Sequence, residues 1–554
     1  MTTPPLLTVT DLDVDYRLSR TRSSRAVTGI GFEIGRGELV SLVGESGSGK
    51  STTAHAVLGL LGDRARITRG SIRFDGTELT TLRDKQWRTL RGARIGFVPQ
   101  DPTVSLNPTR RIGEQIAQSI TLHEGRVPKT VLDDRVVALL TKVGIDRPAL
   151  RARQYPHQLS GGMRQRALIA NALAGEPELI VADEPTSALD VTVQKQILDH
   201  LDELRRELGI AILLITHDLG VAGDRSDRIV VLESGRVAES GPARQLLTDP
   251  QADYTRRLLA AVPHIDSGRL RAPATSTPAT SGPATGPLLE KAPAAILIGS
   301  GLHKTFHESG TDVHAVHDVS ISVRRGRTLG VVGESGSGKS TLARILTRLT
   351  DADSGTVEFD GRDVTPLKGG ELRELRRHIQ LVYQNPFASL DPRFTIGRTL
   401  TEPLRAFGIG TRQSRPARVA ELLDLVGLPT SFADRTPDAM SGGQRQRVAI
   451  ARALATDPSL VVLDEAVSAL DVSVQAQILD LLVRIQAELG VSYLFISHDL
   501  AVIRQISDDI VVMRRGRVVE AGTADRVYTT PAVDYTRDLL AAVPGAHHPR
   551  KVTA

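Results

Sequence analysis

The sequence predicts an α/β fold that occurs twice, as two similar domains in tandem. One observation is internal repetition, because VGESGSGKST stands at Val43–Thr52 and again at Val332–Thr341, and other segments return in the same order. A second is that short, continuously apolar runs alternate with helix-like stretches, which is typical of a mainly parallel sheet covered on both faces. A third is a segment between the copies that has neither pattern. Together they predict two α/β domains joined by a linker.

The two copies differ slightly in length. The repeat distance is 289 residues from Lys50 to Lys339 and 281 residues from His217 to His498. The second copy has therefore lost a few residues net, mostly in loops. Order and spacing otherwise match, so the chain is a tandem duplication.

The predicted sheet strands are mainly apolar runs of six residues. In the first copy they are Leu39–Gly44, Glu178–Asp183 and Ala211–Thr216, and in the second Thr328–Gly333, Ser459–Asp464 and Ser492–Ser497. Helix-like stretches alternate with them, among them Gln194–Leu208 and Gln475–Leu489. A mostly helical insert with little strand signal is expected at about 101–159 and again at about 385–440.

The segment Ala272–Pro287 consists only of Ala, Pro, Thr, Ser and Gly. Such a composition cannot bury enough apolar surface to fold, and proline keeps the chain extended. We therefore expect a flexible linker that lets the two domains face each other. The expected divisions are a first domain at 1–263, the linker at 264–294, a second domain at 295–545 and a tail at 546–554.

The bulk composition excludes several classes of protein. The 554 residues contain no cysteine, which excludes disulfides, thiolate nucleophiles, zinc ribbons and cysteine-ligated iron–sulfur clusters. No apolar run is long enough to cross a membrane, and the N-terminus lacks the features of a signal peptide, so we expect a cytosolic chain. The net charge of +5 is small and spread out, so no nucleic-acid partner is expected.

A phosphate-binding loop is predicted in each copy from the pattern Gly-x-x-x-x-Gly-Lys-Ser, which follows an apolar run and precedes a helix-like stretch. Glycines let backbone N–H groups curl around phosphate oxygens, the helix N-terminus adds a favourable dipole, and the lysine neutralises phosphate charge. A glycine-rich turn with an incidental lysine is the alternative for one copy, but not for two in the same context. The residues expected to bind nucleotide here are Gly44, Ser46, Gly47, Gly49, Lys50, Ser51 and Thr52, with Gly333, Ser335, Gly336, Gly338, Lys339, Ser340 and Thr341.

Two adjacent carboxylates end a predicted strand in each copy, Asp183-Glu184 in the first and Asp464-Glu465 in the second. In open α/β sheets, ligands bind outside the carboxyl ends of the strands. The aspartate suits Mg²⁺, and the glutamate suits an attacking water as base or orienting group. Alone, such a pair is an ordinary solvated strand end. Downstream of a phosphate-binding loop, it predicts an ATP-hydrolysing site.

The segment SGG-x-R-Q-R lies just upstream of each acidic pair, at Ser160–Arg166 and Ser441–Arg447. With it, each half resembles an ABC-type nucleotide-binding domain. The resemblance implies a tandem P-loop NTPase fold, with a RecA-like core, a helical subdomain and an antiparallel β subdomain. The contexts LSGGM and MSGGQ depart slightly from LSGGQ but keep the serine and both glycines. The resemblance implies that these residues grip ATP bound to the opposite domain, namely Ser160, Gly161 and Gly162 with Ser441, Gly442 and Gly443.

The same resemblance gives roles to further positions. Gln100 and Gln384 fall at the Q-loop, and His217 and His498 follow apolar runs as the switch histidine. The segments Ser187–Asp190 and Ser468–Asp471 resemble D-loops. The implied catalytic residues are Glu184, His217, Glu465 and His498, and the implied Mg²⁺ ligands are Ser51, Gln100, Asp183, Ser340, Gln384 and Asp464.

Tyr16 and Phe306 occupy matching places in the first strand region of each half. In the ABC family an aromatic residue there stacks on adenine. The competing interpretation is a strand aromatic in a core.

Two further features resemble the ATP-binding subunits of bacterial oligopeptide, dipeptide and nickel importers. DPTVSLNP and NPFASLDP follow the Q-loop glutamines, and each domain closes with DYTR-x-LLAAVP, close to the family's HPYTR-x-LL. Ala252-Asp253 and Val533-Asp534 stand where the family has His-Pro. The rival is a soluble double-cassette ATPase acting on the ribosome, but such proteins use a long, charged, helical linker. The linker here is nearly uncharged and hostile to helix.

The importer resemblance implies partners and a location. Two integral-membrane permease subunits and an extracytoplasmic substrate-binding protein are implied, with the chain at the cytoplasmic face of the membrane and one copy in each transporter. ATP and Mg²⁺ are the implied cofactors, and both sites should hydrolyse because both keep every catalytic residue type. Peptides are the implied solute, while glutathione, nickel chelates and haem stay open.

Overall fold

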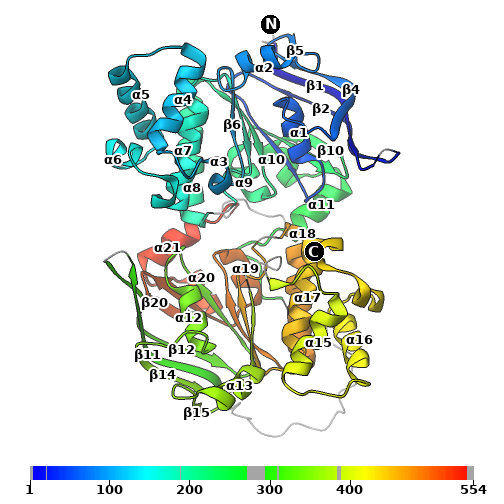
Figure 1. Ribbon diagram of the computed structural model, residues 1–554, viewed down its shortest axis with the longest axis vertical. Coiled ribbons are helices and arrows are strands. Elements are labelled where there is room, and N and C mark those ends of the chain that lie inside the picture. The colour runs from blue at the N-terminus through cyan, green and yellow to red at the C-terminus, as the bar shows by residue number, and fades with distance from the viewer. Residues whose placement is uncertain are drawn as a thin grey trace. The chain divides into compact units, whose positions relative to one another are not determined.

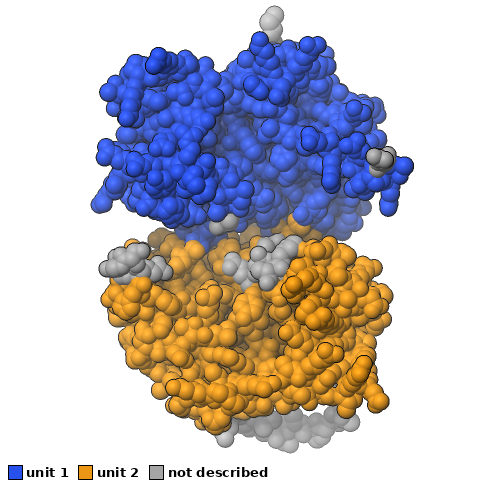
Figure 2. Space-filling view, in the orientation of Figure 1, with its two compact units in different colours: residues 1–262, 544–554 blue, residues 263–543 orange. Residues whose placement is uncertain are grey.

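Figure 1 shows a computed structural model of the chain, which describes residues 4–19, 21–187, 189–270, 294–308, 311–383, 389–468 and 470–545. The described residues form two compact units, coloured separately in Figure 2. Unit 1 contains the residues up to Val262 together with Pro544 and Gly545, and unit 2 runs from Pro263 to Val543. Most of the predicted linker, residues 271–293, and the predicted tail, 546–554, lie outside the described residues.

Unit 1 has an antiparallel sheet in the order β2-β1-β4-β5. A second sheet has the order β10-β9-β3-β8-β7-β6, in which only β10 runs antiparallel to its neighbour. The strands are β1 (Leu7–Arg17), β2 (Ser23–Ile34), β3 (Leu39–Gly44), β4 (Ala65–Phe74), β5 (Thr77–Glu78), β6 (Ile95–Val98), β7 (Leu179–Asp183), β8 (Ala211–Ile215), β9 (Arg228–Glu233) and β10 (Arg236–Pro242). Every residue of β3, β7 and β8 is buried, as expected for short apolar strands covered on both faces.

The helices of unit 1 cover the larger sheet and extend beyond it as a helical part between β6 and β7 (Figure 1). They are α1 (Lys50–Val57), α2 (Asp84–Leu90), α3 (Pro102–Ser105), α4 (Ile112–Glu124), α5 (Lys129–Lys142), α6 (Pro148–Ala152), α7 (Gly161–Leu173), α8 (Val191–Leu208), α9 (Leu219–Arg225), α10 (Ala243–Thr248) and α11 (Asp253–Ala261). Isoleucines on one face of α4 pack with residues of α5 and α7 in one apolar cluster. That packing fixes the start of α7 beside the sheet.

Unit 2 repeats this architecture. Its sheets have the orders β12-β11-β14-β15 and β16-β17-β18-β13-β19-β20. The strands are β11 (Ala295–Glu308), β12 (Thr311–Arg324), β13 (Thr328–Val332), β14 (Ser354–Phe359), β15 (Arg362–Asp363), β16 (Ile379–Val382), β17 (Leu460–Asp464), β18 (Ser492–Ile496), β19 (Asp509–Arg514) and β20 (Arg517–Thr523). The described helices are α12 (Lys339–Leu346), α13 (Gly369–His378), α15 (Ile396–Ala406), α16 (Arg415–Leu425), α17 (Gly442–Leu454), α18 (Val472–Leu489), α19 (Leu500–Ile506), α20 (Ala524–Thr529) and α21 (Asp534–Ala541).

The predicted fold class is confirmed: each unit is an α/β domain with a mainly parallel sheet and a smaller antiparallel one. In the part of the chain that the structure describes, no helix is both long enough and apolar enough to cross a membrane.

Candidate active sites

The loop that joins β3 to α1, and its counterpart between β13 and α12, can be built only with glycine at its first position. A Cβ atom at Gly44 would lie 2.3 Å from the carbonyl oxygen of Leu232, and one at Gly333 would lie 2.2 Å from that of Met513. Both glycines also have positive φ angles, 150° and 149°. The loop can therefore pass tightly over β9 or β19 only without side chains at these positions.

Each loop wraps around a buried lysine. The Nζ of Lys50 donates to the carbonyl oxygens of Gly44 at 2.7 Å and Glu45 at 2.9 Å. Lys339 makes the same two contacts in unit 2, at 2.7 and 2.8 Å. The N-cap residues of α1 and α12, Gly49 and Gly338, have no side chain to cap the helix. A buried ammonium group within a loop that leads into such a helix start suits phosphate.

Two oxygen ligands for a hard cation lie beside each lysine. The Oγ of Ser51 donates to Oδ1 of Asp183 at 3.4 Å, and Ser340 donates to Asp464 at 3.2 Å. Burial raises the pKa of the Asp183 carboxyl, and the neighbouring Glu184 carboxylate raises it further. Burial likewise raises the pKa of Asp464. A bound Mg²⁺ would relieve this cost, so the donor set fits the predicted metal.

Glu184 follows β7 in a left-handed backbone conformation, with φ at 45°, and its N–H donates to the carbonyl oxygen of Ile215 at 2.9 Å. Its carboxylate accepts from Nε2 of Gln100 at 2.8 Å and lies 3.1 Å from Nδ1 of His217. Three side chains that are far apart in the sequence thus meet at the carboxyl end of the sheet. A non-glycine residue held in this conformation is a strained position of the kind that clusters at functional sites.

Unit 2 repeats this arrangement. Glu465 has φ at 49°, and its carboxylate lies 3.4 Å from Nδ1 of His498. The D-loop serines support both turns, because Ser187 and Ser468 donate to the carbonyl oxygens of Glu184 and Glu465. The predicted ligand Gln384 lies outside the described residues.

Glu184 and His217 form an ion pair across the pH interval between their ordinary pKa values. Burial by itself would raise the pKa of Glu184, but the hydrogen bond and charge of His217, with Lys50 and Gln100, hold that pKa below its usual value. Burial would lower the pKa of His217, but the Glu184 carboxylate outweighs burial and raises it. The pair is therefore charged from below pH 4.5 to above pH 6.5, the ordinary values of the two groups.

These directions predict how pH changes the stability of unit 1. The raised pKa of His217 gives stability that is full below pH 6.5 and is lost as pH rises through the folded-state value. The lowered pKa of Glu184 gives stability that is present above pH 4.5 and is lost as pH falls. We expect wild type to melt about 2–4 °C above His217→Gln near pH 6, which corresponds to about 1 kcal/mol, and the gap to close toward pH 9. Thermal melts at five pH values test this, and a constant gap would contradict it.

The two signature segments begin helices α7 and α17. Ser160 caps α7 by accepting from Met163 N, and Ser441 caps α17 by accepting from Gln444 N, each at 3.3 Å. Gln444 also accepts from Ser441 N at 3.0 Å, which completes a capping box that a methionine at Met163 cannot make. Both serines are exposed.

The second glycine of each signature is required by packing. A Cβ at Gly162 would lie 2.6 Å from Cγ1 of Val193, and one at Gly443 would lie 2.3 Å from Cγ1 of Val474. The signature helix is thereby held against the start of α8 or α18, the helix that follows the D-loop. These contacts explain the glycine without involving nucleotide.

The predicted adenine-stacking residues lie at equivalent register positions. Tyr16 pairs with Ser24 across β1 and β2, and Phe306 pairs with Val313 across β11 and β12. The Tyr16 hydroxyl lies 3.3 Å from Oγ1 of Thr52, at the start of α1. Phe306 is 39% exposed, so its ring is not part of a closed core and stays available for a ligand.

Sequence reasoning missed two tyrosines that contact the phosphate-binding loops. The backbone N–H of Glu45 donates to the hydroxyl of Tyr254 at 3.3 Å, and Glu334 donates to Tyr535 at the same distance. Both tyrosines belong to the DYTR segment, on α11 and α21, and both are buried. The repeated DYTR was the available signal, but it was used only as a family marker. Lys50 holds the carbonyl oxygen of Gly44, which belongs to the same peptide unit as the N–H of Glu45, so this peptide unit is fixed from both sides.

Removing the tyrosine hydroxyl should weaken nucleotide binding more than catalysis. We expect Tyr254→Phe and Tyr535→Phe each to raise the KM for ATP about two- to tenfold at its site with little change in kcat, since one neutral hydrogen bond is lost. Steady-state ATPase kinetics measure this. Tyr528→Phe is the matched control, because its buried hydroxyl donates to Leu500 O, away from the loop. A loss of thermal stability without a change in KM would mean that the hydroxyls are only structural.

The matches to known protein families divide the chain into the same two parts. A family model described as "ABC transporter" matches residues 27–187 and 316–468, more than half of the chain. A second, described as "Oligopeptide/dipeptide transporter, C-terminal region", matches residues 238–286. The second match includes α11 and its tyrosine.

Three curated relatives are similar over nearly the whole chain. The oligopeptide transport ATP-binding protein OppD of Mycobacterium bovis is 44% identical and covers 98% of both chains. The glutathione import ATP-binding protein GsiA of Salmonella paratyphi A is 44% identical over 95% of this chain and 88% of its own. The peptidoglycan transport ATP-binding protein YejF of Agrobacterium fabrum is 43% identical over 98% of this chain and 96% of its own.

Proposed function

This chain belongs to the ABC transporter family, and from that premise we propose how its two halves work as a motor. It is an ATPase subunit of an importer, in which ATP hydrolysis drives transport. One observation carries the proposal. Each unit has a buried lysine in its phosphate-binding loop, and in each unit the glutamate of the acidic pair at the strand end contacts a histidine. The relatives named above give no support to the ribosomal alternative.

The two halves are proposed to pair head to tail and to enclose two ATP molecules. One site would combine the loop, acidic pair and histidine of unit 1 with Ser441 and Gly443. The other would combine those of unit 2 with Ser160 and Gly162. Because ATP is gripped from both sides, it favours the closed pair, and hydrolysis removes the bridging phosphate.

Within each site, side chains of this protein would position the nucleotide and the attacking water and would neutralise the phosphate charge. Lys50 would turn from the loop carbonyls toward the phosphates, and Tyr254 would keep the loop in place while the lysine moves. Glu184 would orient and deprotonate the attacking water, with His217 holding its carboxylate and the γ-phosphate. Ser51 and Asp183 would hold Mg²⁺, which supplies charge neutralisation on the phosphate oxygens when bound. Lys339, Ser340, Asp464, Glu465 and His498 would do the same in unit 2.

The remaining proposed nucleotide contacts are Tyr16 and Phe306 for adenine, Gln100 and Gln384 for the metal and water, and the backbone of the phosphate-binding loops. The contacts of Glu184 with His217 and of Glu465 with His498 support the choice of these two glutamates as catalytic, because each brings a carboxylate and a histidine together.

As an importer ATPase, the chain works with integral-membrane permease subunits at the cytoplasmic side of the membrane. We further propose that it binds two permeases peripherally near its Q-loops, that one copy serves each transporter, and that an extracytoplasmic binding protein delivers the solute. The relatives carry the names of three solutes, so the choice of solute belongs to those partners. Di- and oligopeptides are the class we propose.

Co-purification tests this function. The chain should be recovered with the permeases encoded beside it, at one copy for each permease pair, and its ATPase should rise when the loaded binding protein is added. Recovery with ribosomes, or an ATPase that no permease affects, would contradict the importer role. Ligand-induced thermal shifts of the binding protein would identify the solute.

A further inference from the structure

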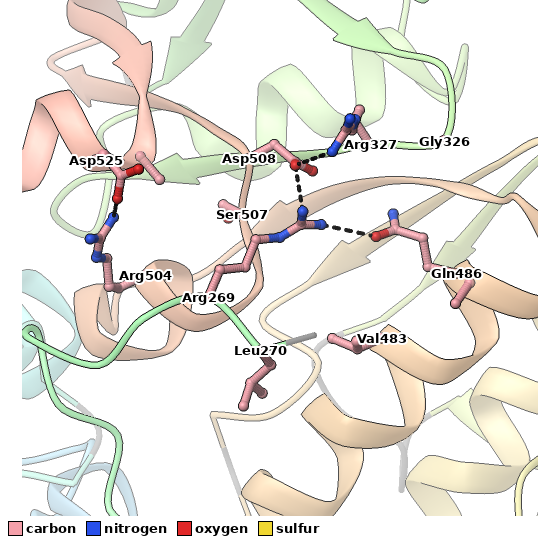
Figure 3. A pocket seen from close by; sticks show the side chains of 12 residues that line it. Arg269, Leu270, Gly326, Arg327, Val483, Gln486, Arg504, Ser507, Asp508 and Asp525 are labelled. Carbon is pink, nitrogen blue, oxygen red and sulfur yellow. Dashed lines mark hydrogen bonds and ion pairs between the residues drawn. The ribbon is translucent and has the colours of Figure 1, made fainter. Parts of the chain in front are cut away.

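Residues 263–270, at the start of the predicted linker, lie on the body of unit 2. The guanidinium of Arg269 contacts Oδ1 of Asp508 at 2.5 Å and Oε1 of Gln486 at 3.2 Å (Figure 3). It also donates to the carbonyl oxygen of Ile506 at 3.3 Å. The next residue adds a backbone contact, because Leu270 N donates to Gln505 O at 2.8 Å. Residues 263–270 are called the clasp below.

The carboxylate that Arg269 meets is buried. The Asp508 side chain is only 7% exposed, and its other oxygen accepts from the backbone N–H of Thr328 at 2.8 Å. Arg327 also reaches Oδ1, at 3.0 Å, but its side chain is 47% exposed. Arg269 is therefore the less exposed of these two arginines, and it ties the carboxylate to α18 through Gln486. A buried carboxylate of this kind needs such a partner.

The corresponding carboxylate of unit 1, Asp227, is 50% exposed, and its arginine partner comes from a helix of its own unit. At the corresponding place, Asp227 accepts from the N–H of Leu39 at 2.8 Å and from the guanidinium of Arg205 at 3.1 Å. Arg205 comes from α8 and is only 11% exposed. The position that matches Arg205 in α18 is Gln486, 281 residues later, which cannot supply a charge. In unit 2 the less exposed guanidinium at this carboxylate comes instead from Arg269, beside the more exposed Arg327.

We propose that the clasp is an integral part of unit 2, the second cassette. Arg269 anchors the chain there and takes the place of the arginine that α18 lacks at Gln486. The clasp divides the linker in two. Val262, the last residue of unit 1 before it, is seven residues from Arg269, a span of at most about 25 Å.

The anchor shortens the effective tether between the cassettes. Without it, the tether from Val262 to Ala294 has 32 residues instead of seven. Effective concentration falls roughly as the −3/2 power of tether length, so one cassette would meet the other at about tenfold lower effective concentration. If closure takes up two ATP molecules, the ATP concentration for half-closure should rise about threefold, the square root of that factor. This last step rests on the proposed closing motion.

Hydrogen exchange on the full chain tests the anchor itself. In wild type, peptides from 263–270 should exchange slowly, and Arg269→Ala should speed their exchange about tenfold or more. Arg256→Ala is the matched control, since it removes an arginine on α11 that forms a local ion pair with Asp253. Unchanged exchange in Arg269→Ala would overturn the proposal.

A second substitution separates anchoring from stability. Gln486→Arg restores in unit 2 the arginine that unit 1 has, and a cavity of about 600 Å³ beside Arg269 gives it room. In Arg269→Ala the melting temperature of the second cassette should fall, and adding Gln486→Arg should recover it. The clasp peptides should nevertheless stay fast-exchanging, because the anchor is still missing. Recovery of slow exchange in the double variant would overturn the role of Arg269.

Closure is measured by fluorescence transfer between dyes. The chain has no cysteine, so Asp133→Cys and Gln413→Cys, both exposed, give one dye site in each cassette. In a Glu184→Gln, Glu465→Gln background, the ATP half-point should rise about threefold in Arg269→Ala, with or without Gln486→Arg. An unchanged half-point would overturn the tether effect. If the parent shows no ATP-dependent closure, the proposed motor mechanism fails, while the exchange experiment still decides the anchor.

Discussion

Replacing Glu184 and Glu465 together by glutamine should lower the ATP turnover of the assembled transporter about 100-fold or more. Glutamine keeps the size of the side chain and can still contact Gln100 or His217, but it cannot take a proton from water. General-base catalysis contributes about 10²–10⁴ in rate, which sets the expected loss. Binding of ATP should persist, because the lysines and the loops are unchanged. Turnover at saturating ATP, with nucleotide binding measured separately, checks both parts.

The single substitutions test whether both sites hydrolyse. Each should lower turnover at least about twofold, since both sites keep a left-handed glutamate beside a histidine. Glu176→Gln is a matched control, because Glu176 is an exposed glutamate with φ at 54° in the same unit. If either single change leaves turnover at the wild-type level, that site is not catalytic.

Much of each site could be predicted from sequence because its parts are local motifs. Spacing alone identifies the loop from Gly44 to Ser51, since its geometry is set within a few residues and by the strand before it. The acidic pair gains meaning from the loop upstream. The structure adds what spacing cannot state, namely that Glu184, Gln100 and His217 meet. These three residues follow β7, β6 and β8, which are neighbouring parallel strands, so the order of the strands brings them together.

Contacts between distant residues were not predictable in the same way. Tyr254 meets Glu45 across 209 residues, and on an amphipathic helix it resembles an ordinary core tyrosine. The linker gave a different difficulty. Its composition identifies residues 272–287 as unable to fold, but Arg269 lies just before them. The sequence indicates the role of Arg269 only indirectly. Gln486 stands where the first copy has Arg205, and this loss of a charge is visible only when the two copies are aligned.

The pairing of the two halves should be decided by combining one glutamate with each signature serine. Ser441→Asp and Ser160→Asp suit this purpose, because aspartate caps a helix as well as serine does while it adds a negative charge against a γ-phosphate. Both serines are exposed in their own units, so neither change should disturb folding. Melting temperatures close to wild type would confirm that control.

If the halves pair head to tail, Glu184 and Ser441 serve one site. Glu184→Gln with Ser441→Asp should then damage a single site and keep the turnover of Glu184→Gln alone. Glu184→Gln with Ser160→Asp should damage both sites and fall to the level of the double glutamine variant, at least about tenfold lower. The reverse ranking would mean that each signature serves its own cassette, and equal losses would mean that the serines do not distinguish the sites. The ranking depends on which residues share a site, so it separates these arrangements even if the two sites turn over at different rates.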